Sequence, residues 1–175
     1  MGSSKKVAHI DFILIDNQFE TITFRFLPRK SSCHSFDDNP PQCWEGVYKV
    51  YYAYEIIKAS KLTGKTERVY KCHCDECSVI DDIALRCKLI ADGHTHHLVK
   101  REDESYKVKL LNVEVRPFGY GTSWKLIKSN KKIEIQLFRW DNKGYRFSLD
   151  KETLRKFGEY LEECCEYMLA YGDPI

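Results

Sequence analysis

The sequence lacks the features that most directly reveal a membrane protein or an enzyme. No apolar run approaches the roughly 18 residues that a bilayer-spanning helix requires, which argues against a membrane partner. There is also no glycine-rich phosphate-binding or dinucleotide-binding turn, no His-Glu-x-x-His motif and no Ser-His-Asp order. Because such motifs carry nucleotide binding, zinc-dependent hydrolysis and acyl transfer, these enzyme classes have no signature here.

A secretory signal and a biased composition are absent as well. The basic start at residues 1–12 contains no apolar segment and no small-residue cleavage site. We therefore expect an intracellular protein, cytoplasmic or nuclear, in a reducing compartment. Hydrophobic residues make up 43% and charged residues 31% of the 175 residues, as in an ordinary globular chain. We expect a single domain, residues 1–175, with a division into 1–93 and 94–175 as the alternative.

Alternation of polar and apolar residues predicts strands in the first part of the chain. Residues 7–16 and 19–28 each alternate with period 2, which is typical of a β-hairpin. Residues 47–60 permit a helix, but their β-branched and aromatic side chains favour a strand. Residues 67–74 would return as its partner after a turn at Gly64.

Two segments carry the apolar spacing of a helix. Residues 78–93 have an apolar stripe, a capping Ser78 and a terminating Gly93, and residues 151–171 follow a capping Asp150. Five further strands are predicted between these helices, at residues 94–100, 106–118, 123–129, 131–140 and 144–150. The predicted fold class is α+β, a mostly antiparallel, strongly twisted sheet or half-barrel with one mid-chain helix and a long C-terminal helix packed on it.

Cysteine is plentiful, with eight residues, and three of them lie in the segment CHCDEC at residues 72–77. In a reducing compartment, closely spaced cysteines at the junction of a strand and a helix favour zinc or free thiols over disulfides. A structural zinc ion requires four converging ligands. The predicted ligands are Cys72, Cys74, Cys77 and Cys87, with His94 or His97 as the alternative fourth ligand.

Other assignments of these thiols stay open. The polar loop at residues 29–46 contains Cys33, His34 and Cys43, which are further donors for the same ion. Free cysteines at the edge of the core are the first alternative, because cysteine is commonly buried as a small apolar residue. A Cys74–Cys77 redox pair at a helix start is the second. Structural zinc is the one cofactor that the sequence predicts.

The segment HTHH permits an interpretation as an enzyme. His94 and His96 would point to the same side of a strand, an arrangement that metal-dependent oxygenases and hydrolases use for two ligands. Asp92, or Asp37 and Asp38 in the polar loop, would supply a carboxylate. The alternative is an exposed, polar strand start without catalytic function.

Basic and aromatic residues are interleaved between Arg116 and Arg146. Eight basic and two acidic side chains give this stretch a local net charge of +6. The aliphatic residues within 132–140 would occupy the core side of a strand, so Phe138 and Trp140 point outward unless another layer covers them. The predicted binding residues are Lys125, Lys128, Lys132, Phe138, Arg139, Trp140, Lys143 and Arg146.

This surface is the basis of the predicted function. Aromatic rings among cations suit the stacking of unpaired bases and the binding of phosphates. We expect a non-enzymatic intracellular protein that contacts single-stranded nucleic acid or a nucleic-acid-bound protein complex. The first alternative is a protein-only adaptor or inhibitor that docks on a larger assembly, because Trp, Tyr and Arg are common interface anchors. The second is a metal-dependent enzyme that uses His94 and His96.

Overall fold

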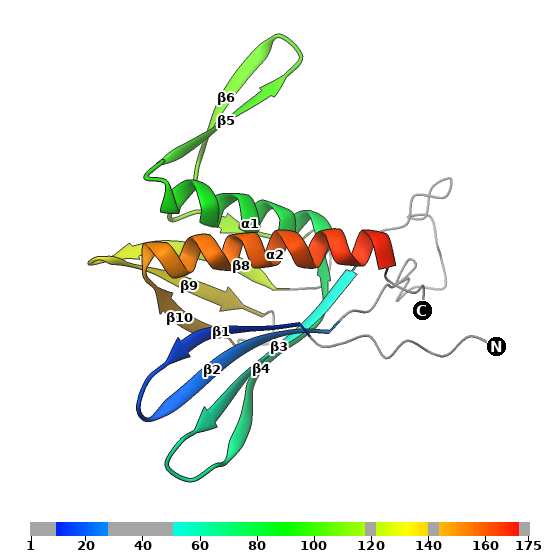
Figure 1. The fold of residues 1–175 in the computed structure, drawn as a ribbon. Coiled ribbons are helices and arrows are strands. Elements are labelled where there is room, and N and C mark those ends of the chain that lie inside the picture. Colours follow the sequence, from blue (N-terminus) through cyan, green and yellow to red (C-terminus); the bar gives the residue numbers. More distant parts are fainter. Residues whose placement is uncertain (1–9, 28–50, 118–121, 140–143, 172–175) are drawn as a thin grey trace, which may run out of the picture.

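The computed structural model describes residues 10–27, 51–117, 122–139 and 144–171, and these ranges have an α+β fold (Figure 1). Within them, ten strands form three antiparallel sheets, and two helices lie together over the two larger sheets. The predicted class is therefore confirmed, including the mid-chain helix and the long C-terminal helix. The sheets are twisted but stay open and do not close into a barrel.

The first sheet contains four strands in their order along the chain. They are β1 (Ile10–Asp16), β2 (Glu20–Leu27), β3 (Tyr51–Ser60) and β4 (Thr66–Glu76). Alternation in β2 buries Ile22, Phe24 and Phe26 and leaves the residues between them half-buried. Residues 51–60 form a strand and not a helix, as their β-branched and aromatic side chains predict.

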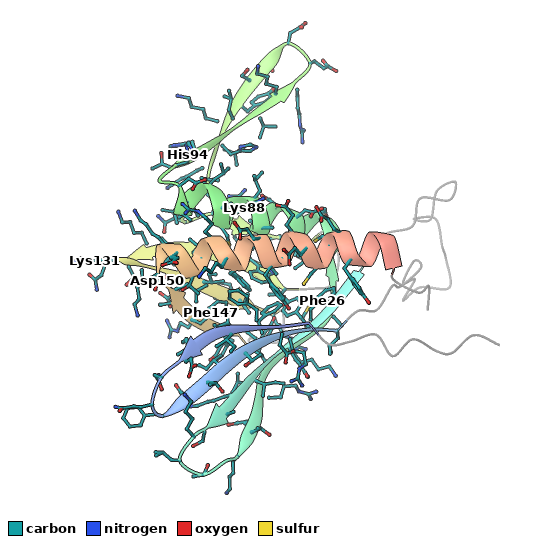
Figure 2. The ribbon with its side chains drawn as sticks, viewed as in Figure 1. Phe26, Lys88, His94, Lys131, Phe147 and Asp150 are labelled. Atoms are coloured by element: carbon teal, nitrogen blue, oxygen red, sulfur yellow. The ribbon has the colours of Figure 1, made fainter. Side chains whose placement is uncertain are left out.

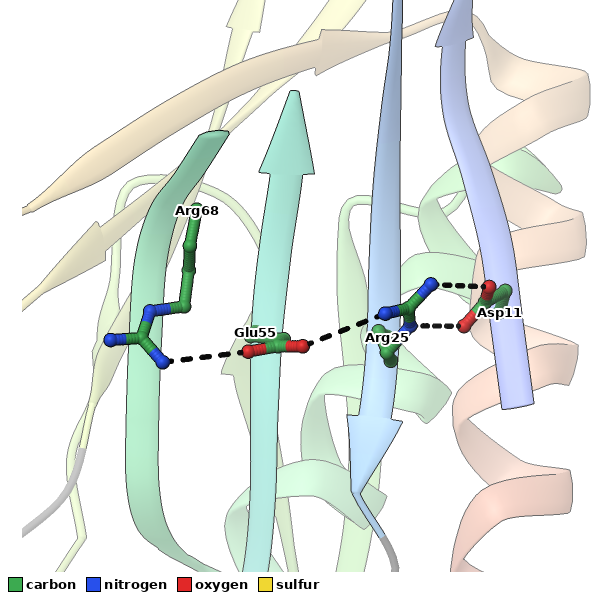
Figure 3. A network of polar contacts seen from close by, with 4 residues as sticks. All are labelled: Asp11, Arg25, Glu55 and Arg68. Carbon is green, nitrogen blue, oxygen red and sulfur yellow. Dashed lines mark hydrogen bonds and ion pairs between the residues drawn. The ribbon is translucent and has the colours of Figure 1, made fainter. Parts of the chain in front are cut away.

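Charged side chains of alternating sign lie across the outer side of this first sheet (Figure 3). Arg25 of β2 donates hydrogen bonds of 2.9 and 3.1 Å to the two carboxylate oxygens of Asp11 on β1. Glu55 of β3 lies 3.8 Å from Arg25 and 3.7 Å from Arg68 of β4. The hydrogen bond to Asp11 raises the pKa of Arg25 above its ordinary value. Two arginines and two carboxylates thus neutralise one another on this surface.

The remaining strands form a second four-stranded sheet and a separate hairpin. The hairpin consists of β5 (His96–Arg101) and β6 (Glu104–Lys109), and the second sheet has the order β10-β9-β8-β7. The strands of the second sheet are β7 (Glu114–Val115), β8 (Ser123–Ser129), β9 (Lys132–Phe138) and β10 (Tyr145–Leu149).

One predicted strand, residues 106–118, is wrong as a single element, because it divides into β6 and β7. Leu110 between them is 1% exposed and enters the core. Asn112 adopts a left-handed backbone with φ 60° and donates its N–H to the Leu126 carbonyl at 2.8 Å. Asn tolerates this conformation better than most residues, so the chain turns there and cannot continue as one strand.

The two helices run antiparallel and side by side (Figure 1). Helix α1 (Cys77–Ala91) begins one residue before the predicted cap and ends near Gly93, which has a left-handed φ of 89°. Helix α2 (Lys151–Tyr171) starts at the predicted cap, where Asp150 Oδ1 accepts the Thr153 N–H at 2.8 Å. This hydrogen bond satisfies one of the N–H groups that have no partner inside the helix.

A glycine allows the helices to approach closely. A Cβ atom at Gly158 of α2 would lie 2.8 Å from the carbonyl oxygen of Ala84 on α1, which is too close for two non-bonded atoms. Lys88 and Glu162 form an ion pair beside this contact. The lack of a side chain at Gly158 therefore sets the distance between the helices.

Aromatic rings fill the layer between the helices and the two sheets. Phe24 of β2 stacks on Tyr54 of β3 with ring centroids 4.8 Å apart, and Trp124 of β8 lies 5.8 Å from Tyr54. Phe157 of α2 contacts Phe24 at 5.4 Å and Phe147 of β10 at 6.0 Å. Figure 2 shows Phe147 in this layer below α2. Both sheets and α2 therefore share one core.

Candidate nucleic-acid interface

The second sheet presents one side to this core and one to its surroundings. Ile133, Ile135 and Leu137 of β9 are buried on the core side, as their alternation predicts. The residues between them, and those paired with them in register on β7, β8 and β10, lie on the other side. We call this side the β7–β10 face, and its residues include Glu114, Lys125, Lys132, Glu134, Gln136, Phe138 and Arg146.

A cavity of about 600 Å³ lies on the β7–β10 face. Lys125, Phe138, Tyr145 and Arg146 contribute to its lining. Phe138 is 43% exposed, so its ring remains accessible and is not covered by another described element. This accessibility agrees with the outward direction that the sequence predicts for Phe138. A hollow with an exposed ring and flanking cations has the dimensions and chemistry to hold an aromatic base.

Two carboxylates reduce the positive charge of the face. Arg116 donates a 2.7 Å hydrogen bond to Glu114, and this bond lowers the pKa of Glu114 below its ordinary value. Arg146 lies 3.8 Å from Glu134. The face therefore mixes both signs, unlike the +6 charge of the whole 116–146 stretch. Exposed ion pairs contribute little stability, so a phosphate group can replace the carboxylate partner at small cost.

Two other predicted binding residues, Lys128 and Arg139, lie in different surroundings. Lys128 of β8 pairs with the buried Ile133, so it lies on the core side of the pleat at the exposed end of its strand. Arg139 is half-buried and donates a 2.8 Å hydrogen bond to the Lys71 carbonyl, which joins the second sheet to β4. Lys128 therefore does not lie with Lys125 on the β7–β10 face, whereas Arg139 lines the same cavity as Lys125. Trp140 and Lys143 lie outside the described residues.

Tyr145 belongs to the site although its position in the strand predicts the core side. It is half-buried, and burial raises the pKa of its hydroxyl. Next to it, a Cβ at Gly144 would lie 2.5 Å from the Leu137 carbonyl oxygen, so only glycine fits at this close approach to β9. Glu114 reaches the site because β7 pairs with β8, which local alternation does not show. Tyr145 pairs with the buried Leu137 and lines the cavity from the end of its strand.

The predicted zinc ligands are only partly described. Cys72 and Cys87 are both buried in the core cluster, and burial raises the pKa of the Cys87 thiol to about 12. Both thiols are enclosed among apolar side chains, as is common for core cysteines. The side chains of Cys74 and Cys77 lie outside the described residues. Within the described part of the chain, no group of three His, Cys, Asp or Glu side chains has an arrangement that could hold a metal ion.

The two histidines proposed as an alternative fourth ligand lie beyond the other end of α1. This helix has 15 residues, which corresponds to a length of roughly 22 Å. His94 is exposed in the turn after α1, and His97 lies half-buried in β5 (Figure 2 labels His94). The structure therefore does not bring either histidine next to Cys72.

The histidines of the suggested enzyme site stand at an exposed chain reversal. His96 pairs with Lys109 across the hairpin and is exposed. Asp92, the suggested carboxylate ligand, accepts a hydrogen bond from Arg155 of α2. Asp37 and Asp38 lie outside the described residues.

The fold defines the α+β class, and comparison with known proteins gives no family or function beyond it. The chain matches no protein-family model, and neither curated proteins nor solved structures match it. Of the helices in the described ranges, neither combines the length and apolar character required to cross a bilayer. The functional argument therefore depends on the chemistry of the surfaces themselves.

Proposed function

We propose that this chain is a non-enzymatic, intracellular binding protein whose β7–β10 face contacts single-stranded nucleic acid, free or within a nucleic-acid-bound protein complex. The observation that carries the proposal is the exposed Phe138 ring beside Lys125 and Arg146 in one cavity of about 600 Å³. In this arrangement, a base stacks on Phe138 and the cations contact the adjoining phosphates. Stacking of this kind contributes about 1–3 kcal/mol per base.

The pairing of strands supports this division of roles. Phe138 stands opposite Ser123, and Lys125 and Arg146 both stand opposite Gln136, so the ring and both cations share one side of adjacent strands. Residues two apart on a strand are separated by roughly 6.6 Å, which permits one ligand to contact the ring and a cation together. Gln136, between the two cations, provides both a donor and an acceptor for a base edge.

Titration of a labelled oligothymidylate at several salt concentrations tests this function. We expect binding at low salt, weakening as salt displaces the phosphate contacts. Replacing Phe138 by Ala should reduce affinity about 5- to 150-fold, which corresponds to the loss of one stacked base. The matched control is Phe19→Ala, since Phe19 is 55% exposed and lies in the β1–β2 turn of the other large sheet. Absence of binding at low salt, or equal effects of the two substitutions, would overturn the proposal.

Neighbouring lysines on β8 provide a second matched pair. Lys125 lies on the β7–β10 face, whereas Lys128 lies on the opposite side of the same strand. Lys125→Ala should lower the dependence of log K on log salt by about 0.7, the value for one phosphate contact in a single strand. Lys128→Ala should leave this slope unchanged. If both variants reduced the salt dependence equally, the oligonucleotide would be held by the general positive charge of the protein and not by a site on the β7–β10 face.

A protein-only adaptor or inhibitor is the second candidate, and the carboxylates Glu114 and Glu134 favour it. Mixed charges surrounding an exposed aromatic ring are common where one protein contacts another. This candidate predicts that Glu134→Gln weakens partner binding, whereas the nucleic-acid candidate predicts stronger oligothymidylate binding because Arg146 loses its carboxylate neighbour. The direction of the Glu134→Gln effect therefore distinguishes the two functions.

A further inference from the structure

The β5–β6 hairpin projects away from the rest of the fold. Figure 1 shows it extending from the end of α1, on the side of the helices opposite the first sheet. Its strands pair only with each other, so neither belongs to a larger described sheet. A two-stranded hairpin is marginally stable alone in water, and this one is attached at its base. Arg86 of α1 is 6% exposed and donates a 2.8 Å hydrogen bond to the Lys109 carbonyl.

Register shows that the two sides of the hairpin have different surroundings. His97, Val99 and Val108 lie on one side, and they line a cavity of about 240 Å³ together with α1 residues such as Leu85. The part of this side that lines the cavity is directed to the helix, and Val99 and Val108 make it largely apolar. The other side contains paired positions from both strands, and their side chains are exposed. We call it the basic hairpin face, and its residues are His96, Leu98, Lys100, Ser105, Lys107 and Lys109.

The basic hairpin face contains no carboxylate. Glu104 pairs with Arg101 on the helix-directed side and accepts a hydrogen bond from Tyr106, and Glu102 and Asp103 occupy the turn. Within the described ranges, no ion pair involves the three lysines of the face, all of which are exposed. This contrasts with the outer side of the first sheet and with the β7–β10 face, where carboxylates partner the cations. A surface with cations alone is complementary to a polyanion.

The shape of the element selects among polyanions. A twisted two-stranded ribbon fits the major groove of duplex DNA, which is about 12 Å wide. Exposed lysines from both strands can then contact the phosphates on either side of the groove. Leu98 is 52% exposed in the centre of the face, where an apolar side chain can contact the edges of bases. We propose that the basic hairpin face is a second binding surface, specific for the phosphate backbone of double-stranded DNA. It is separate from the β7–β10 face and does not depend on the function proposed there.

The test measures binding of a labelled DNA duplex across a range of salt concentrations. A variant with Lys100, Lys107 and Lys109 changed to Gln should reduce the magnitude of the negative slope of log K against log salt by about 2.7, or 0.9 for each lost phosphate contact. The matched control replaces three exposed lysines elsewhere, Lys65, Lys128 and Lys151, and changes the net charge equally. A variant with three Arg substitutions in the hairpin should retain the slope, because it keeps the three positive charges. An unchanged melting temperature of the Gln variant excludes misfolding as the cause.

Separate probes distinguish this proposal from its competitors. Phe138→Ala should weaken oligothymidylate binding and leave the salt dependence of duplex binding unchanged. The triple Gln variant should reduce the salt dependence of duplex binding and leave oligothymidylate binding unchanged. Absence of duplex binding at low salt, or an equal loss in the control variant, overturns the proposal. Binding to phosphatidylserine vesicles that depends on the same lysines, without duplex binding, also overturns it and identifies an anionic membrane surface as the partner.

Discussion

The aromatic core and the β5–β6 hairpin differ strongly in how far their side chains are buried. Phe24, Tyr54 and Trp124 are each 0% exposed and connect the two large sheets. In the hairpin, Leu98 and Tyr106 remain 52% and 48% exposed. The core therefore contributes most of the folding free energy, while the hairpin buries little and adds little to stability.

The difference in burial indicates whether a side chain is present for packing or for binding. A ring in the core is explained by packing, because its removal leaves a cavity. Packing gives no reason for the three lysines and the exposed leucine on the basic hairpin face. Binding gives such a reason. Substitutions on the basic hairpin face should therefore change the affinity for a ligand and leave the free energy of unfolding unchanged. The contrast can be tested with substitutions in both regions.

The largest expected effect is that of Phe24→Ala in the core. The Phe24 ring contacts Tyr54, Trp124 and Phe157, so both sheets and α2 lose a common neighbour. We expect a loss of about 3–5 kcal/mol of unfolding free energy, measured by denaturant titration. The control is Phe19→Ala at a 55% exposed position, for which the change should stay within about 0.5 kcal/mol. Similar losses for both variants would contradict a core organised around Phe24.

An intermediate effect is expected where the helices meet. Gly158→Ala adds a Cβ atom 2.8 Å from the Ala84 carbonyl oxygen, and a backbone atom cannot move away as easily as a side-chain tip. Overpacking costs about 1–3 kcal/mol and the better helix propensity of Ala returns about 1. We expect a net destabilisation of up to about 2 kcal/mol in thermal unfolding. Glu159→Ala, at the exposed neighbouring position, serves as the control, and a stabilised Gly158→Ala variant would show that the helices can separate freely.

A smaller effect is expected at the start of α2. The hydrogen bond from the Thr153 N–H lowers the pKa of Asp150, so the charged carboxylate stabilises the folded state. Asp150→Ala should cost about 1 kcal/mol at neutral pH. This contribution is complete above the unfolded-state pKa of about 3.9 and is lost as the pH falls through the lower folded value.

The control for this cap is Asp150→Asn. Asn retains the acceptor oxygen but cannot titrate, so this variant should keep most of the stability and lose the pH-dependent part. Melting temperatures measured between neutral pH and the acid range test both statements. Equal melting temperatures for the Ala variant and the unchanged protein at neutral pH would contradict the capping role.

Local patterns were sufficient for most elements and for one side of the candidate interface. Alternation identified β2, β8 and β9, and it placed Phe138 outward because side chains on a strand change sides at each residue. The caps predicted where α2 begins. The break at Asn112 was missed, because a single left-handed residue interrupts an otherwise regular alternation without changing its composition.

The arrangement of these elements depends on pairings that sequence spacing does not contain. The expected single sheet is two four-stranded sheets and a hairpin, and nothing in the local pattern of residues 106–118 shows that β6 and β7 belong to different sheets. Similarly, Glu114 joins the β7–β10 face only because β7 pairs with β8. Long-range pairing therefore determines the charge of the face, and local counting overestimates it.

The smallest expected effect is that of Leu98→Ala in the hairpin. Leu98 is 52% exposed, so the free energy of unfolding should change by less than about 0.5 kcal/mol, whereas Leu126→Ala in β8, at 0% exposure, should cost about 2–5 kcal/mol. Hydrogen exchange provides the corresponding measurement without substitution, since amides of β5–β6 should exchange faster than those of β8–β9. A loss above about 1 kcal/mol for Leu98→Ala, or equal protection of both pairs, would mean that the hairpin unfolds with the core. In that case, its exposed residues would have a structural role, and their presence would no longer favour a binding surface.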